Sequence, residues 1–372
     1  MKSLEYGDEK ISEKEILIAI PSMVIGVGIL SLPRRIADET IGSDGWIALV
    51  IAGAVCVLMI WLMAKLAARF PHQSFISYAS IIVSKPIAKI ITFLFAVLFI
   101  SIAAFHIRVL GDTSQQYLFN QTPVEVVTLS FLLVVVYAVS GARAALFRLN
   151  MLFFPFIIFI LLLVLIFNFR WIEPSNLLPV FQTNVKDYWK GIQTSTLSYM
   201  GFSIVLFYTA FARQPKKAPK IAVLGMTIPI VIYVFVYLTC LMVFGQISTS
   251  NLLFPTIDLA KRIELPGGIL ESVESVFFVV WTMGAFTTTA MALDVSILAL
   301  SYIFNRMKKI GLVLILSPIV YYIALLPRDI SQISLIAGLL GTIVISYSFL
   351  TTLVLFLIAK LRGVGRNDKT SA

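Results

Sequence analysis

Residues 21–35 read PSMVIGVGILSLPRR, and this stretch decides the fold because it places glycines and prolines inside a long apolar run. A capping box at Ser12 and Glu15 predicts that a helix begins just upstream. Gly26 and Gly28 are poor helix formers and fall near the middle of the run. They could serve close packing between membrane helices. They could instead mark an unwound segment, which is tolerated inside a bilayer only where the freed backbone groups line a cavity or meet a ligand.

Apolar runs recur along the whole chain. Of its 372 residues, 59% are hydrophobic and 13% are charged, whereas about a quarter of a soluble domain is charged. A helix needs about 20 residues to cross a hydrocarbon core, and the alternation of barrel strands is missing. We therefore expect an all-α membrane protein of ten transmembrane helices, with spans at about 15–36, 45–70, 86–112, 123–140, 149–168, 190–212, 221–244, 269–300, 310–326 and 332–360.

A second interrupted span is predicted in the other half of the chain, where residues 198–203 read SYMGFS. The first span begins near residue 15 and the sixth near 190, and the same shift of 175 carries Gly26 onto Gly201. With five spans in each half, the second half would enter the membrane in the opposite orientation. This predicts a five-plus-five inverted repeat, 15–168 and 190–360, within a single integral membrane domain, 1–372. In such folds the first helix of each half is broken and the substrate lies between the breaks.

The distribution of basic residues predicts the topology. With a cytoplasmic N-terminus, the inner loops and tails carry 20 Lys and Arg and the outer ones carry 8. An excess of basic residues marks the cytoplasmic side, so both termini should be cytoplasmic. The net charge of +10 then follows membrane topology, and we expect no nucleic-acid partner. The longest outer loops, about 169–189 and 245–268, could be lids, partner contacts or simple tethers.

Signatures of enzymes, cofactors and metals are missing from the sequence. It has no nucleotide-binding glycine loop and no His-Glu-x-x-His, and His72 and His106 are its two histidines. Cys56 and Cys240 sit within apolar runs, where a thiol usually packs as a small apolar group. We expect no catalytic residues, no cofactor and no metal.

Polar residues at membrane depth are functional candidates by default. Arg108 and Asp112 are four residues apart and are expected to form a structural ion pair. His106 could take part in proton linkage or simply form a hydrogen bond. Thr287 and its two successors point in different directions around a helix, so one of them could reach a ligand, although a Thr in a helix often bonds a carbonyl of its own helix.

Several short motifs together resemble the spore germination permeases, a branch of the amino acid, polyamine and organocation transporter superfamily. Residues 26–34 read GVGILSLPR, and they are followed by Asp44-Gly45-Trp46, by Arg69-Phe70-Pro71 and by residues 176–180, NLLPV. The resemblance covers the whole chain and implies a leucine-transporter-like fold with broken helices 1 and 6. It also implies the inner membrane of a bacterial spore, and a receptor assembled with A and C subunits.

The resemblance further implies a small-molecule nutrient ligand between the two breaks, with helices 3 and 8 closing the sides. The candidate substrate-binding residues are Gly26, Val27, Gly28, Ser101, Ile102, Tyr199, Gly201, Thr287 and Thr288, of which Ser101 and Ile102 are placed by depth alone. The predicted fifth helix, 149–168, lacks the lysine that proton-coupled members of the superfamily can carry. Ion coupling through that lysine is therefore not expected.

Three functions stay open at this point. A signalling subunit would respond to an amino acid, sugar or nucleoside by preferring one conformation. A secondary transporter would move an amino acid or a related solute by rocking one repeat against the other. A channel component would be opened by partner proteins. The broken helices suit all three, and the family motifs favour the receptor.

Overall fold

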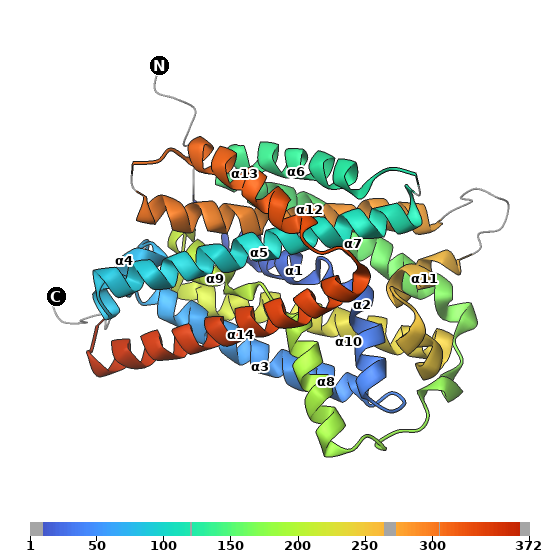
Figure 1. Cartoon of the computed structure of the whole chain (residues 1–372). Coiled ribbons are helices and arrows are strands. Elements are labelled where there is room, and N and C mark those ends of the chain that lie inside the picture. The colour runs from blue at the N-terminus through green and yellow to red at the C-terminus, as the bar shows by residue number, and fades with distance from the viewer. Residues whose placement is uncertain (1–9, 120, 264–272, 305, 365–372) are drawn as a thin grey trace.

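The computed structural model describes residues 10–119, 121–263, 273–304 and 306–364, which are nearly all helical. Eight long helices follow the predicted spans (Figure 1): α3 (Gly45–Ala68), α5 (Lys85–Tyr117), α6 (Val124–Ser140), α7 (Arg143–Phe167), α10 (Ala218–Asn251), α12 (Val273–Ile303), α13 (Lys309–Leu325) and α14 (Ile330–Leu361). The first four residues of the predicted span 269–300 lie outside the described residues.

The number of spans is only partly settled by helix length. Within the described residues, six helices are long and apolar enough to cross a membrane, or seven if α1 (Glu13–Ile25) and α2 (Gly28–Glu39) form one bent span. Two further apolar helices, α6 and α13, have 17 residues each, slightly fewer than the 20 or so that a bilayer usually requires. The count of ten and the inverted repeat stay predictions.

The first span is broken where the two glycines predicted it. The capping box at Ser12 and Glu15 is present, α1 ends at Ile25, and α2 begins at Gly28 with its axis bent by 53°. Gly26 has φ −14° and ψ −111°, which no helical residue adopts. Pro21 lies within α1 and does not end it. The break therefore follows the glycines and not the proline.

The sixth predicted span is broken as well. It consists of α8 (Val185–Ser198), the 3₁₀ turn η4 (Phe202–Ile204), α9 (Val205–Tyr208) and the 3₁₀ turn η5 (Thr209–Phe211). Gly201 stands between the two parts with φ +103°, a conformation that favours glycine because a side chain would clash with the backbone. Both interruptions predicted from the sequence are confirmed.

Among the helix boundaries that differ from the predicted ones, two have an identifiable reason. We expected the fifth span to begin at 149, but α7 begins at Arg143, because this arginine is buried and paired instead of lying in a loop. The predicted end at 244 of the seventh span coincides with a kink at Gly245, φ +74°, beyond which helical turns continue to Asn251.

The connecting segments contain short elements that the sequence did not predict. They are α4 (Phe75–Ile82), α11 (Pro255–Lys261) and the 3₁₀ turns η2 (Asn168–Trp171), η3 (Pro174–Leu177) and η6 (Pro215–Lys217). In Figure 1, α4 and α11 lie at opposite ends of the bundle. The α4 helix is anchored by a hydrogen bond from the Tyr78 hydroxyl to the carbonyl of Leu206, at 3.0 Å.

The two ends of the described chain lie at the same end of the bundle. Arg362, after α14, donates to the carbonyl of Ile82 at the end of α4. At the other terminus, the amide of Ile11 donates to Phe211, and Arg213 donates back to Ile11, which ties the chain before α1 to the end of the sixth span. An even number of spans would place the two ends of the chain on the same side of the membrane, as this arrangement requires.

Candidate functional site

The two helix breaks lie directly against each other. A Cβ added at Gly28 would stand 3.1 Å from the carbonyl oxygen of Ser198, and one added at Gly201 would stand 3.0 Å from side-chain atoms of Met23. Tyr233, on α10, joins the two, because its hydroxyl lies 2.8 Å from the carbonyl of Val24 and 3.3 Å from that of Ser198. The two interrupted segments therefore pack directly against each other and share the Tyr233 hydroxyl as a hydrogen-bond donor.

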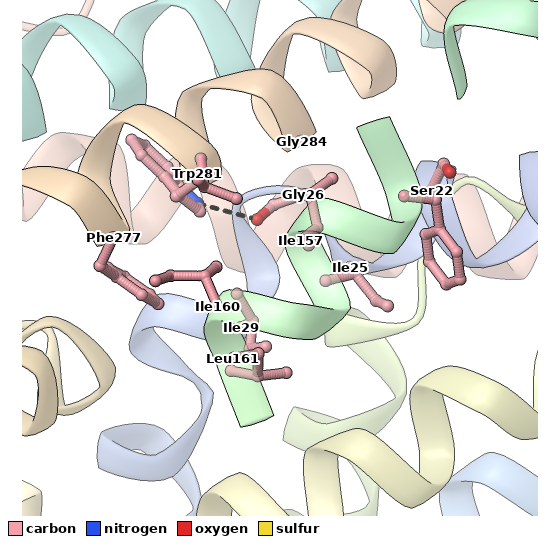
Figure 2. Close-up of a pocket in the computed structure, with 12 residues that line it drawn as sticks. Ser22, Ile25, Gly26, Ile29, Ile157, Ile160, Leu161, Phe277, Trp281 and Gly284 are labelled. Carbon is pink, nitrogen blue, oxygen red and sulfur yellow. Dashed lines mark hydrogen bonds between the residues drawn. The ribbon is translucent and has the colours of Figure 1, made fainter. Parts of the chain in front are cut away.

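Side chains from neighbouring helices satisfy the backbone carbonyls around the first break. Thr288 donates to the carbonyl of Ser22 at 2.8 Å. Trp281 Nε1 donates to the carbonyl of Gly26 at 3.0 Å (Figure 2). A buried carbonyl without a partner is unfavourable by about 1–3 kcal/mol. These donors therefore make an unwound helix 1 stable inside the bundle.

A small apolar cavity adjoins the first break (Figure 2). Its volume is about 20 Å³, room for one or two water molecules. Its walls come from α1, α2, α7 and α12 and include Ile25, Gly26, Ile157, Ile160, Phe277 and Trp281. A nutrient molecule does not fit in this space, so this cavity is not the candidate ligand site.

A larger cavity, of about 240 Å³, lies where the two breaks face α5 and the first turns of α14. We call it the central cavity. Its walls include Met23, Val27, Gly28, Phe105, His106, Ser198, Ile333 and Ala337. Apolar side chains with a few polar groups among them are typical of small-molecule sites. The central cavity is the candidate ligand site.

Charged residues of α2 reach the central cavity. Arg34, Arg35 and Asp38 all line it, and Arg35 Nη2 donates to the hydroxyl of Ser198 at 2.9 Å. This bond crosses from α2, the second part of the broken first span, to the second break. The sequence prediction missed this role of Arg35, since it counted the two arginines only as outer-loop charges.

The predicted site residues divide into those that line a cavity and those that support it. Gly26 lines the small cavity, and Val27 and Gly28 line the central cavity. Tyr199 and Gly201 line neither. Tyr199 is fully buried, bonds the carbonyl of Leu49 and packs on the ring of Tyr233.

The threonines of α12 also support the fold around the site. Thr287 and Thr288 donate to Gly284 within their own helix, and Thr288 reaches Ser22 in addition. On α5, Ser101 donates to its own helix at Val97, and Ile102 is buried. None of these four residues lines either cavity, and a ligand contact for them stays a prediction.

The ionisable residues of α5 behave as structural groups. Arg108 and Asp112 form the expected ion pair, with 2.9 Å between Nε and the carboxylate. His106 Nδ1 lies 2.8 Å from the carbonyl of Ile102, although another part of the residue lines the central cavity. The expected hydrogen bond of His106 is thus present, and its part in proton linkage stays a prediction.

A cluster of buried charges near the C-terminal end of α12 was not predicted from the sequence. Asp294, fully buried, accepts from Arg143 Nε at 2.7 Å and from Tyr208 at 3.0 Å, and Lys309 Nζ lies 3.8 Å away. The cluster joins α7, α9, α12 and α13. The signal for it was one acidic residue inside an apolar span, which requires a partner.

Comparison with known sequences points to one family. The family described as "Spore germination protein" matches residues 10–333. Spore germination protein GerLB of Bacillus cereus is 37% identical over the full length of both chains. YndE of Bacillus subtilis (strain 168) is 27% identical over 96% of this chain and 98% of its own, and spore germination protein A2 of the same strain is 27% identical over 93% and 94%.

Comparison with solved structures identifies the fold. The structure of MhsT in complex with L-phenylalanine superposes with a TM-score of 0.70 at 15% identity and covers 96% of this chain and 97% of the other. MHP1, a nucleobase-cation-symport-1 family transporter with bromovinylhydantoin bound, gives a TM-score of 0.69 at 11% identity and covers 95% and 78%. The fold is therefore leucine-transporter-like, and the chain is a multi-pass membrane protein.

Proposed function

Since the chain belongs to the spore germination protein family, we propose that it is the integral membrane subunit of a spore germinant receptor, which binds a small nutrient and signals the start of germination. The nutrient would be an amino acid, a sugar or a nucleoside. The protein would reside in the inner membrane of a bacterial spore, with both termini cytoplasmic. It would assemble there with the A and C subunits of the receptor.

The observation that supports the proposal is the central cavity beside the two breaks. It lies between segments of both halves of the chain, namely α2 from one and the end of α8 from the other. A ligand bound there contacts both halves at once. It can therefore shift the equilibrium between conformations in which the halves lie closer together or further apart.

A route for the signal leads along the broken helices. Away from the breaks, α1 and the segment from η4 to η5 extend to the same end of the bundle. There the chain before α1 pairs with the chain after η5, Ile11 with Ala212. Because the backbones are hydrogen-bonded there, the two segments would move together. By the predicted topology this end is cytoplasmic, and a partner subunit could sense the movement.

A binding experiment with a matched pair of variants tests the proposal. Ala337 lines the central cavity from α14, whereas Leu335, on the same helix, is 65% exposed and lines neither cavity. We expect that Ala337→Trp fills the cavity and abolishes binding, and that Leu335→Trp leaves binding unchanged. The measurement is the heat of binding of amino acids, sugars and nucleosides to the purified protein in lipid nanodiscs.

Two outcomes would contradict the proposed site. Binding that survives Ala337→Trp would place the ligand elsewhere. If none of the nutrients binds to a sample shown to be folded, this chain does not recognise nutrients by itself.

The alternative function is a secondary transporter, which the shared fold with MhsT and MHP1 favours. The two functions are distinguished by whether the protein moves the ligand across a membrane. A ligand that binds in nanodiscs is added to proteoliposomes as a radiolabelled compound, with a sodium or proton gradient imposed. Uptake above that of protein-free liposomes would establish transport, and binding without uptake would favour the signalling subunit.

A further inference from the structure

Arg35 is a partly buried guanidinium with incomplete partners. Of its N–H groups, Nη2 donates to the hydroxyl of Ser198, while the buried Nε has no hydrogen-bond partner. No carboxylate in the described part of the chain forms an ion pair with it. An arginine within a membrane protein usually meets an anion or a carbonyl, because its charge is costly to bury alone.

The surroundings of Arg35 do not supply the missing negative charge. Arg34 also lines the central cavity, which adds to the positive charge of this wall. Asp38 is the one acidic side chain among the described lining residues; it is exposed and forms no ion pair with either arginine. The wall that α2 contributes therefore carries a net positive charge.

The backbone adds to this preference for an anion. The first turn of α2, at Val27 and Gly28, forms part of the same cavity wall, and Val27 provides no side-chain cap. Free N–H groups at a helix N-terminus favour a negative group. The remaining lining is mostly apolar, with Met23, Phe105 and Ile333 among a few polar side chains, and suits a small hydrocarbon body.

We infer that the ligand of the central cavity carries a carboxylate, which binds the guanidinium of Arg35 beside the hydroxyl of Ser198. A guanidinium presents a planar fork of donors that matches the two oxygens of a carboxylate. The ligand class is then a small carboxylic acid, such as an amino acid. A sugar or a nucleoside would leave the charge of Arg35 uncompensated. The inference rests on the proposed function, because it assumes that the cavity binds a nutrient.

The experiment compares each amino acid that binds with its carboxamide, which keeps the amino group and lacks the carboxylate, in wild type and in Arg35→Gln. In wild type the amide should bind at least about 30-fold more weakly, as expected when one partner of a buried charge pair is lost. In Arg35→Gln the acid and the amide should bind to the variant with equal, weak affinity. A merely structural role of Arg35 would weaken both compounds and preserve their ratio.

Two further variants sharpen the result. Arg35→Lys keeps a charge without the planar fork. Its affinity for the acid should therefore lie between the affinities of wild type and Arg35→Gln. Arg148→Gln removes an exposed arginine at the start of α7, away from the cavity, and should change nothing.

The outcomes separate this inference from the proposed function. Equal affinity for acid and amide, or binding of an uncharged sugar or nucleoside that Ala337→Trp abolishes, would overturn the inference and leave the site intact. Sodium chloride that competes with the acid, and binds wild type as tightly as the acid does, would identify an inorganic-anion site and also overturn it. Absence of all binding to folded protein would remove the proposed site itself, and this inference with it.

Discussion

The carboxylate of Asp294 lies 2.7 Å from Nε of Arg143 at a point where neither side chain is more than 8% exposed. Arg143 begins α7, Asp294 lies in the last third of α12, and Tyr208 and Lys309 complete the cluster. Four helices thus meet at one buried carboxylate. The fold around α9, which follows the second break, depends on this charge balance.

Removal of one partner should be unfavourable by about 3–5 kcal/mol, because a buried charge is left uncompensated. We expect Asp294→Asn to be more destabilising than Arg143→Met. After Arg143→Met, Asp294 keeps Lys309 and Tyr208, whereas after Asp294→Asn the guanidinium loses its negative partner and keeps a neutral amide oxygen and its contact with the Phe211 ring. Unfolding temperatures in detergent measure the order. The double variant should be more stable than the sum of the single losses implies, and simple additivity would argue against the pair.

Gly26 and Thr288 provide a second prediction. A Cβ at Gly26 would stand 2.5 Å from Oγ1 of Thr288, so Gly26→Ala should destabilise the protein by overpacking, about 1–3 kcal/mol. In a Thr288→Ala background the same substitution should be less harmful, because the clashing oxygen is gone. The difference between the two losses is the coupling energy of the pair.

The matched control for this pair is Gly338→Ala on α14, where an added Cβ meets nothing within 4 Å. Alanine is the better helix former, so this variant should be neutral or slightly stabilising. Equal losses for Gly26→Ala in both backgrounds would show that backbone conformation, and not Thr288, requires the glycine.

The helix breaks could be predicted from the sequence because their signal is local. Glycine at mid-span is unfavourable in either half of the chain, and the equal offsets of Gly26 and Gly201 marked both positions. The capping box at Ser12 was likewise visible in four consecutive residues. Such features can be predicted without knowing which other helices pack against the segment.

Apart from Val27 and Gly28 at the first break, the walls of the central cavity could not be predicted, because they depend on which residues of distant helices meet. Tyr199 and Thr287 stand at suitable depths, yet both are buried against other helices, and Arg35 and Ala337 line the cavity instead. Depth along a helix follows from the sequence, but rotation about its axis follows from packing. The buried position of Arg143 was missed for the same reason.

Trp281 provides the third prediction, since its indole N–H satisfies the carbonyl of Gly26 at 3.0 Å. Trp281→Phe keeps most of the ring and removes the donor. The buried carbonyl would then lack this partner, which should lower the free energy of unfolding by about 1–3 kcal/mol. Trp189→Phe, at a side chain that is 61% exposed, should have little effect. Equal effects of the two changes would mean that the bond to Gly26 contributes nothing.

Asp44 offers a prediction about pH. This residue follows α2, is buried, and accepts hydrogen bonds from the backbone amides of Phe181, Gln182 and Thr183, at 2.6, 2.9 and 2.9 Å. It thereby fixes the loop before α8 to the turn between α2 and α3. Burial opposes ionisation of the carboxyl, but the hydrogen bonds from Thr183 and Phe181 outweigh it and hold the pKa of Asp44 below its ordinary value.

The sign of the effect follows from that direction. A group whose pKa is lower in the folded than in the unfolded protein stabilises the fold above its unfolded pKa, about 4 for aspartate, and this contribution is lost as the pH falls through the lower folded value. Asp44→Asn should therefore reduce stability by about 1–3 kcal/mol at pH 7, the usual effect of removing one partner of buried hydrogen bonds.

Unfolding temperatures measured between pH 7 and pH 3 test this prediction. The gap between wild type and Asp44→Asn should be constant down to about pH 5 and should shrink below about pH 4, where the wild-type carboxyl becomes protonated. Asp329→Asn serves as the control, because Asp329 caps α14 through a bond to Gln332 that asparagine can also accept. A gap between wild type and Asp44→Asn that is independent of pH would show that the loop requires the shape of this side chain and not its charge.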